Sequence, residues 1–84
     1  MPRILIIDDE PEVRDFLVAA LTRAGYEAHA VANGREGVHH CRRVDVDLVI
    51  TDLVMPEQEG LETIIELQRE HPGVPVIAIS GGAR

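Results

Sequence analysis

The sequence contains no lysine and no tryptophan, and it has one phenylalanine, one tyrosine and one cysteine. Because aromatic residues make up only 2% of the chain, its core has to be built from aliphatic side chains. The lone Cys41 excludes an internal disulfide and fits a reducing compartment, so we expect a cytoplasmic protein. No apolar run approaches the roughly 20 residues that span a bilayer, and the first residues lack the pattern of a signal peptide. We therefore expect no association with a membrane.

Positively charged residues are also scarce. The chain has 15 acidic residues against eight basic ones, all of them arginine, for a formal net charge of −7. This balance argues against direct binding of nucleic acid by this segment. A length of 84 residues is below the usual domain size of roughly 100–150, so the chain holds at most one domain.

Three short apolar runs each end on side chains that carry oxygen. Arg3–Ile7 is followed by Asp8 and Asp9, Leu48–Thr51 by Asp52, and the run 74–79 by Ser80. Apolar runs bounded by turn residues predict buried strands. If the strands are parallel, their carboxyl ends meet at one edge of a sheet, which is where open α/β sheets bind ligands. We therefore expect three carboxylates and a hydroxyl to converge.

Carboxylates that converge in this way raise one another's pKa unless a cation compensates their charge. A hard divalent cation with oxygen ligands is the natural compensator, and Mg²⁺ typically uses one or two carboxylates together with water and a phosphate. The sequence therefore predicts a Mg²⁺ site at this edge of the sheet.

Helical patterns alternate with the strands. The first begins at Asp9 or Glu10 with Pro11 near its first position, and it ends at Gly25, which we expect to be a left-handed cap. Its apolar residues recur at helical spacing and predict a buried face: Val13, Phe16, Leu17, Ala20, Leu21 and Ala24. A strand is expected at 26–31, and helices at about 34–43, with Gly37, Val38 and Cys41 inward, and from 60 or 61 to 70. Strands alternating with helices predict an α/β fold with a parallel sheet, in the order 2-1-3-4.

These residues resemble the receiver domain of two-component response regulators. The similarity extends along the whole chain through four motifs in the family's order and spacing: Ile4–Glu10, Gly25–Glu27 with Ala32–Gly37, Asp47–Pro56 with Gly60, and Val74–Gly81. The resemblance implies a flavodoxin-like, doubly wound sheet and a signalling module that is not an enzyme in the ordinary sense.

The resemblance also implies a role for each site residue. Asp52 would accept a phosphoryl group from a sensor histidine kinase, a phosphotransfer protein or a small phosphodonor. Mg²⁺ would be bound by Asp9, by Asp8 directly or through water, by Asp52, and by the main-chain carbonyl of Val54. Ser80 would hydrogen-bond the phosphoryl oxygens.

The chain departs from the family's pattern after its fourth strand. The fifth strand, the last two helices and the lysine that pairs with the phosphoryl group have no counterpart here. We therefore expect residues 1–84 to be the N-terminal portion of a single receiver domain, although a naturally shortened domain remains an alternative. The fourth strand would then be an open sheet edge, which predicts self-association.

Plainer interpretations accompany these predictions. Asp8 and Asp9 could serve only as a helix cap, and Ser80 before two glycines could be an ordinary turn residue. Adjacent His39, His40 and Cys41 point in different directions on a helix, so solvated histidines and a buried cysteine are favoured over a metal site. The alternative functions are a receiver-like interaction module that is not phosphorylated and, with less support, an aspartate-nucleophile phosphohydrolase.

Overall fold

A parallel sheet forms the centre of the structure, a computed structural model that describes residues 1–53 and 59–79. In chain order the elements are β1 (Arg3–Ile7), α1 (Pro11–Arg23), β2 (Glu27–Val31), α2 (Gly34–Arg43), β3 (Leu48–Asp52), α3 (Glu59–Glu70) and β4 (Val76–Ile79). The described strands lie in the order β2-β1-β3-β4, and every neighbouring pair is parallel. The predicted α/β class and strand order are confirmed.

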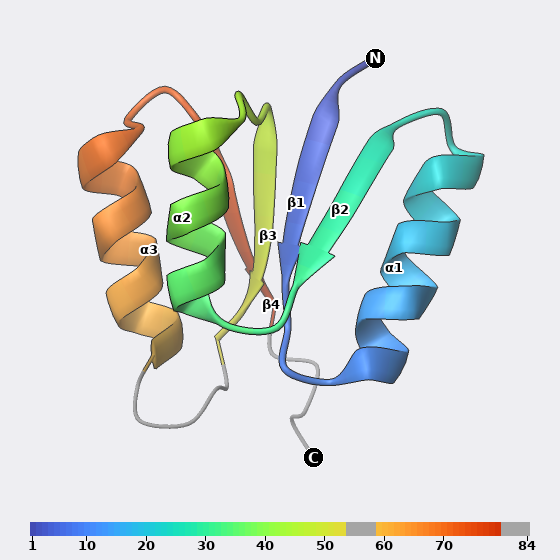
Figure 1. Ribbon diagram of the computed structural model, residues 1–84, viewed down its shortest axis with the longest axis horizontal. Helices are drawn as coiled ribbons and strands as arrows, with labels where there is room; N and C mark the ends of the chain where they lie inside the picture. The colour runs from blue at the N-terminus through green and yellow to red at the C-terminus, as the bar shows by residue number, and fades with distance from the viewer. Residues whose placement is uncertain (54–58, 80–84) are drawn as a thin grey trace.

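The strands all run in the same direction, so their carboxyl ends lie together at the lower edge in Figure 1. Helix α1 lies on one side of the sheet, and α2 and α3 lie together on the other side (Figure 1). Several boundaries differ from the predicted ones by one or two residues; β2 begins at Glu27 and α3 at Glu59. Asp52 is the last residue of β3 rather than the residue after it, and β4 begins at Val76 because Pro75 has no N–H to donate.

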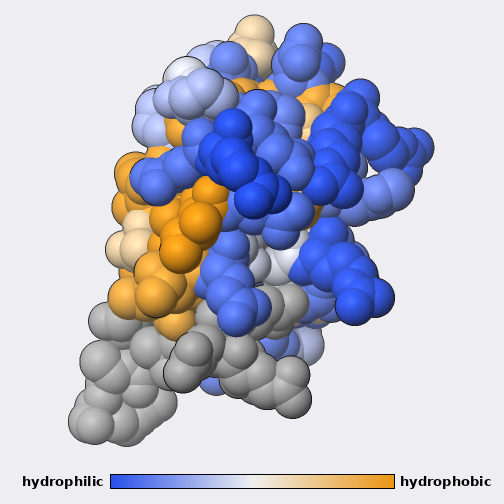
Figure 2. Space-filling model, turned by 90° about the vertical axis from the view of Figure 1, so that its left-hand side faces the viewer, coloured by the Kyte–Doolittle hydropathy of each residue, from blue (hydrophilic) through white to orange (hydrophobic). Residues whose placement is uncertain are grey.

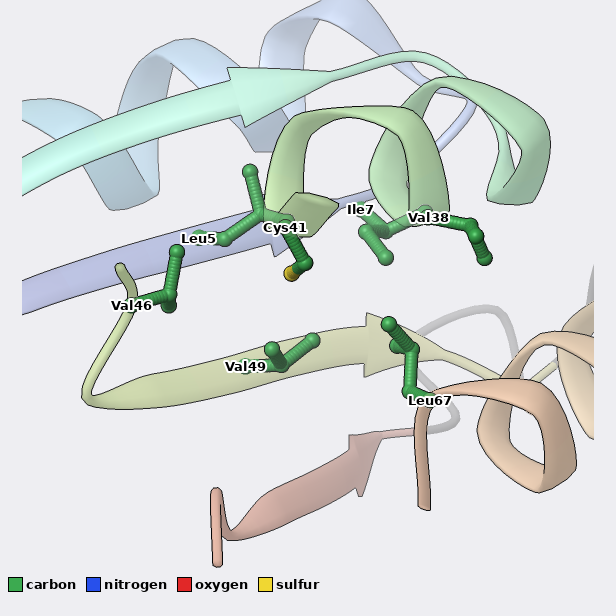
Figure 3. Close-up of a cluster of buried hydrophobic side chains, with 7 residues drawn as sticks. All are labelled: Leu5, Ile7, Val38, Cys41, Val46, Val49 and Leu67. Atoms are coloured by element: carbon green, nitrogen blue, oxygen red, sulfur yellow. The ribbon is translucent and has the colours of Figure 1, made fainter. Parts of the chain in front are cut away.

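The main hydrophobic core lies between the sheet and the helices α2 and α3. Figure 3 shows its buried side chains pointing toward one another from strands, from helices and, for Val46, from the connection between α2 and β3. They are Leu5, Ile7, Val38, Cys41, Val46, Val49 and Leu67. The core is aliphatic, as the composition predicts. The prediction that Gly37, Val38 and Cys41 face inward on α2 is confirmed, since all three are buried.

The helix ends follow local chemistry. Gly25 has φ +98°, so the expected left-handed residue after α1 is confirmed. At the start of α2 the Asn33 side chain accepts a hydrogen bond from the Glu36 N–H at 2.9 Å. The Glu36 side chain in turn accepts from the Ala32 N–H at 3.2 Å. These contacts fix the turn between β2 and α2.

The prediction of a buried face on α1 is wrong for the described part of the chain. No residue of α1 is buried, and Phe16 is 70% exposed. The helix packs on β2 and β1, at one side of the strand order, and the described residues place no helix beyond it over β3 and β4 on that face of the sheet. The apolar stripe is therefore present, but only part of it finds a packing partner.

A second apolar surface lies on the side of the molecule where α3 is found. Figure 2 shows an apolar strip there, next to a strongly hydrophilic area. On α3 and β4, Leu61, Ile65 and Ile77 are each about half exposed, whereas Leu67 is buried. The described part of the chain thus leaves the sheet uncovered around β4.

Candidate phosphoacceptor and metal site

Three carboxylates meet at the carboxyl edge of the sheet. Asp8 follows β1, Asp9 comes next, and Asp52 ends β3, the strand paired with β1. One carboxylate oxygen from each of them lies within 4.8 Å of the other two. The predicted convergence of Asp8, Asp9 and Asp52, which we call the acidic cluster, is therefore present in the structure.

The members of the acidic cluster differ in exposure. Asp8 and Asp52 are buried, at 3% and 6% exposed, whereas Asp9 is exposed. Burial raises the pKa of Asp8, and the nearby Asp52 and Asp9 carboxylates raise it further, against the Glu10 N–H, which favours the ionised form. An extra positive charge at this place would relieve a cost that the fold itself creates.

The turn after β1 is held by hydrogen bonds on three sides. The Asp8 N–H donates to the Val31 carbonyl at 3.1 Å, which continues the pairing with β2. The Asp8 carboxylate accepts from the Glu10 N–H at 2.9 Å. The Arg14 guanidinium of α1 donates to the Asp8 carbonyl at 2.7 Å. Asp8 therefore does contribute to the turn that starts the helix, as the plainer interpretation held, but the capping interpretation does not explain why Asp52 lies beside it.

The acidic cluster suits a hard cation. Three carboxylates from two adjacent strand ends supply oxygen donors only, and the arrangement leaves a buried carboxylate with a raised pKa. These residues therefore fit Mg²⁺. Val54 and Ser80 lie outside the described residues, so their predicted roles stay predictions.

Gly60 explains how close the start of α3 comes to the acidic cluster. A Cβ atom at this position would lie 2.6 Å from the Leu53 carbonyl oxygen and 2.9 Å from that of Asp52. The motif that pointed to the family includes Gly60, but sequence reasoning gave no reason for a glycine there. The reason is close approach of α3 to the backbone at the end of β3.

Arg14 is a site residue that the sequence did not identify. It lies on the first turns of α1, and only the structure shows that its side chain reaches back to the Asp8 carbonyl. Elsewhere, His39 is exposed, His40 is partly exposed and Cys41 is buried, which agrees with the interpretation of solvent-facing histidines and a buried cysteine. Among the described residues the group suited to a metal ion is the acidic cluster.

Comparison with known proteins agrees with this geometry. The family model for the response regulator receiver domain matches residues 4–84, so the chain belongs to that family. The chemotaxis protein CheY of Thermotoga maritima is 38% identical over 79 residues, which cover 93% of this chain and 66% of CheY. The transcriptional regulatory protein GlrR of Escherichia coli K12 is 39% identical over 77 residues, covering 92% of this chain but 17% of GlrR.

Solved structures show the same fold. The response regulator TrrA of Thermotoga maritima in complex with Mg²⁺-BeF is 37% identical, with a TM-score of 0.87, and the match covers 93% of this chain and 68% of TrrA. A structure of histidine kinase ThkA in complex with TrrA matches the whole chain with a TM-score of 0.89 at 34% identity and covers 72% of the matched chain. The expected receiver fold is confirmed, and the chain spans roughly two thirds of the length of CheY and of the matched TrrA chains but 17% of GlrR. Among the described residues no helix has the length and apolar character that crossing a bilayer requires.

Replacing Gly60 with alanine tests the close approach. The new methyl group meets backbone oxygens, which cannot move without shifting Asp52, so we expect the free energy of unfolding to fall by about 1–3 kcal/mol. Urea denaturation followed by circular dichroism measures it. Gly73→Ala is the matched control, because nothing lies within 4 Å of a Cβ there. Equal stability of the two variants would contradict the close approach.

Asp8→Asn tests the cost of burying the carboxylate. Because the pKa of Asp8 is higher in the folded state than its usual value of 3.8, the folded state binds the proton more tightly, and stability falls as the pH rises through the folded pKa. In EDTA at pH 7 to 8 we therefore expect a higher thermal midpoint for Asp8→Asn than for the wild type. The difference should shrink as the pH falls through the folded pKa. Asp15→Asn, on the exposed side of α1, is the control; a lower midpoint for Asp8→Asn at pH 7 to 8 would count against a net cost of burial.

Proposed function

We propose that this chain is a phosphoacceptor module of two-component signalling, in which Asp52 receives a phosphoryl group at a Mg²⁺ site formed by the acidic cluster. The observation that carries the proposal is the meeting of three carboxylates within 4.8 Å at the edge where β1 and β3 end. Family membership and the Mg²⁺-BeF complex of TrrA support it.

The transfer itself requires positioning more than covalent chemistry from the protein. A carboxylate oxygen of Asp52 attacks the phosphorus, and the bond from phosphorus to the donor breaks. The leaving atom, a histidine nitrogen or a carboxylate oxygen of a small donor, keeps the electron pair. Bound Mg²⁺ supplies positive charge that offsets the repulsion between the phosphoryl oxygens and the carboxylates.

Each remaining role belongs to the same proposal. Asp9 and Asp8 hold the metal, with Asp8 acting directly or through water, and the Val54 carbonyl adds a ligand. Ser80 hydrogen-bonds the transferred group: its chain neighbour Ile79 is the register partner of Asp52, which supports this placement. Since the sequence has no lysine, the family's ion pair to the phosphoryl group cannot come from this segment.

The proposed donor is a sensor histidine kinase or a phosphotransfer protein in the cytoplasm, and the complex of ThkA with TrrA supports a kinase partner. The module would lose its phosphoryl group slowly by hydrolysis and act by changing contacts with other proteins. The chain spans only part of the length of its relatives. That a longer protein containing residues 1–84 regulates a process through these contacts is therefore also part of the proposal.

Intact mass spectrometry tests the acceptor. After incubation with MgCl₂ and acetyl phosphate, we expect one phosphoryl adduct on the wild type and none on Asp52→Asn, because the amide is not a nucleophile. Asp15→Asn, with an exposed carboxylate on α1, should keep the adduct. An adduct on Asp52→Asn would refute the assignment. A folded wild type that binds Mg²⁺ without forming an adduct would favour the interaction module that is not phosphorylated.

We also propose that the 84-residue chain pairs with a second copy through β4. This strand has β3 on one side and no other described strand beyond it. The Pro75 and Ile79 carbonyls accept from β3, so the alternation along a strand turns the backbone groups of Val76 and Ala78 to the open edge. Charged side chains commonly protect an edge strand from pairing with another chain. The segment 74–79 contains no charged residue.

Antiparallel pairing centred on Ile77 would bring the two Ile77 side chains together on one face. We expect light scattering after size-exclusion chromatography to show a dimer whose fraction rises with concentration. Ile77→Lys should shift the equilibrium from dimer to monomer, because two ammonium groups would face each other in the dimer. Ala19→Lys, at an exposed position of α1, should leave the equilibrium unchanged. A well-folded wild type that stays monomeric at millimolar concentration would overturn the proposal.

A further inference from the structure

The guanidinium group of Arg14 contacts the main chain of the turn after β1, not a carboxylate of that turn. Its Nη1 atom donates to the Asp8 carbonyl oxygen at 2.7 Å, while the Asp8 carboxylate accepts from the Glu10 N–H instead. The Asp8 carbonyl belongs to the peptide group that joins Asp8 to Asp9. Fixing this peptide plane fixes the direction in which the next residue leaves the turn.

The other hydrogen bonds of the turn act on different groups from the one that Arg14 donates to the Asp8 carbonyl. The bond from the Asp8 N–H to Val31 holds the peptide before Asp8, and the Glu10 N–H holds the Asp8 side chain. Asp9 itself is exposed. Of these three hydrogen bonds, the one from Arg14 acts on the peptide that joins Asp8 to Asp9.

We propose that Arg14 is a positioning residue for the metal site: it orients the Asp8–Asp9 peptide so that the Asp9 carboxylate faces the acidic cluster. The inference rests on the proposed Mg²⁺ site and adds a residue outside the ligand set. Arg14 is half-buried and comes from α1, so the helix that packs against β1 and β2 also sets the geometry of the ligands.

Charge and positioning predict opposite effects when Arg14 is replaced. A cation beside an anionic site competes with Mg²⁺, so removing it would tighten Mg²⁺ binding if charge alone mattered. Loss of the hydrogen bond to the peptide would weaken Mg²⁺ binding, since groups that orient metal ligands typically contribute 10–100-fold in affinity. The direction in which the Mg²⁺ affinity changes therefore distinguishes an effect of charge from an effect of positioning.

The experiment is a titration of the uniformly ¹⁵N-labelled chain with MgCl₂, followed by amide chemical shifts, which report folding and affinity together. For Arg14→Met we expect about tenfold weaker binding than for the wild type, with amide shifts at Asp9 and Glu10 that differ from the wild type before Mg²⁺ is added. Arg23→Met, at the far end of the same helix, should bind as the wild type does. Unchanged or tighter binding by Arg14→Met would overturn the inference.

A second variant covers the case in which Arg14→Met does not fold. Arg14→Lys keeps the charge and the aliphatic stem but lacks the planar guanidinium that reaches the Asp8 carbonyl. We expect Arg14→Lys to bind Mg²⁺ more weakly than the wild type, and equal affinity would overturn the inference. A wild type that binds no Mg²⁺ would overturn both this inference and the proposed metal site, whereas wild-type binding with unaffected variants overturns this inference alone.

Discussion

Repulsion between the carboxylates of Asp8, Asp9 and Asp52 is the constraint around which the described structure is arranged. The backbone places them together: β1 and β3 are parallel neighbours, so their last residues meet whatever side chains they carry. Hydrogen bonds to the main chain of Asp8 and the close approach of Gly60 then leave the strand ends little freedom to move apart. Free energy from the aliphatic core thus holds together groups that would separate in water.

A site built in this way favours added positive charge. Arg14 contributes some, but its contact is with a carbonyl group, and it lowers the pKa of Asp8 less than burial raises it. The acidic cluster offers oxygens from three carboxylates to a divalent cation, whereas the Arg14 guanidinium contacts the Asp8 carbonyl. In a chain that has no lysine, the metal would therefore provide most of the charge that an incoming phosphoryl group meets.

Much of this could be predicted from sequence because the decisive information is local. Apolar runs that end on Asp8 or Asp52 fix where the strands stop, and the parallel arrangement brings those ends together. The exposure of Phe16 could not be predicted, because an amphipathic pattern shows which face of α1 is apolar and not whether a surface lies opposite. The contact of Arg14 was missed because the reach of a long side chain back to the preceding turn depends on the angle at which the helix leaves the sheet.

The uncovered part of the sheet is one strand away from the acidic cluster, and backbone pairing connects the two. Ile79 is the register partner of Asp52, and the Leu53 N–H donates to the Ile79 carbonyl at 2.7 Å. A direct backbone hydrogen bond thus joins the end of β4 to the residue that follows Asp52. Because β4 is also the open edge among the described strands, one strand pairing separates the acidic cluster from that edge, and this pairing lies outside the main hydrophobic core between the sheet and the helices α2 and α3.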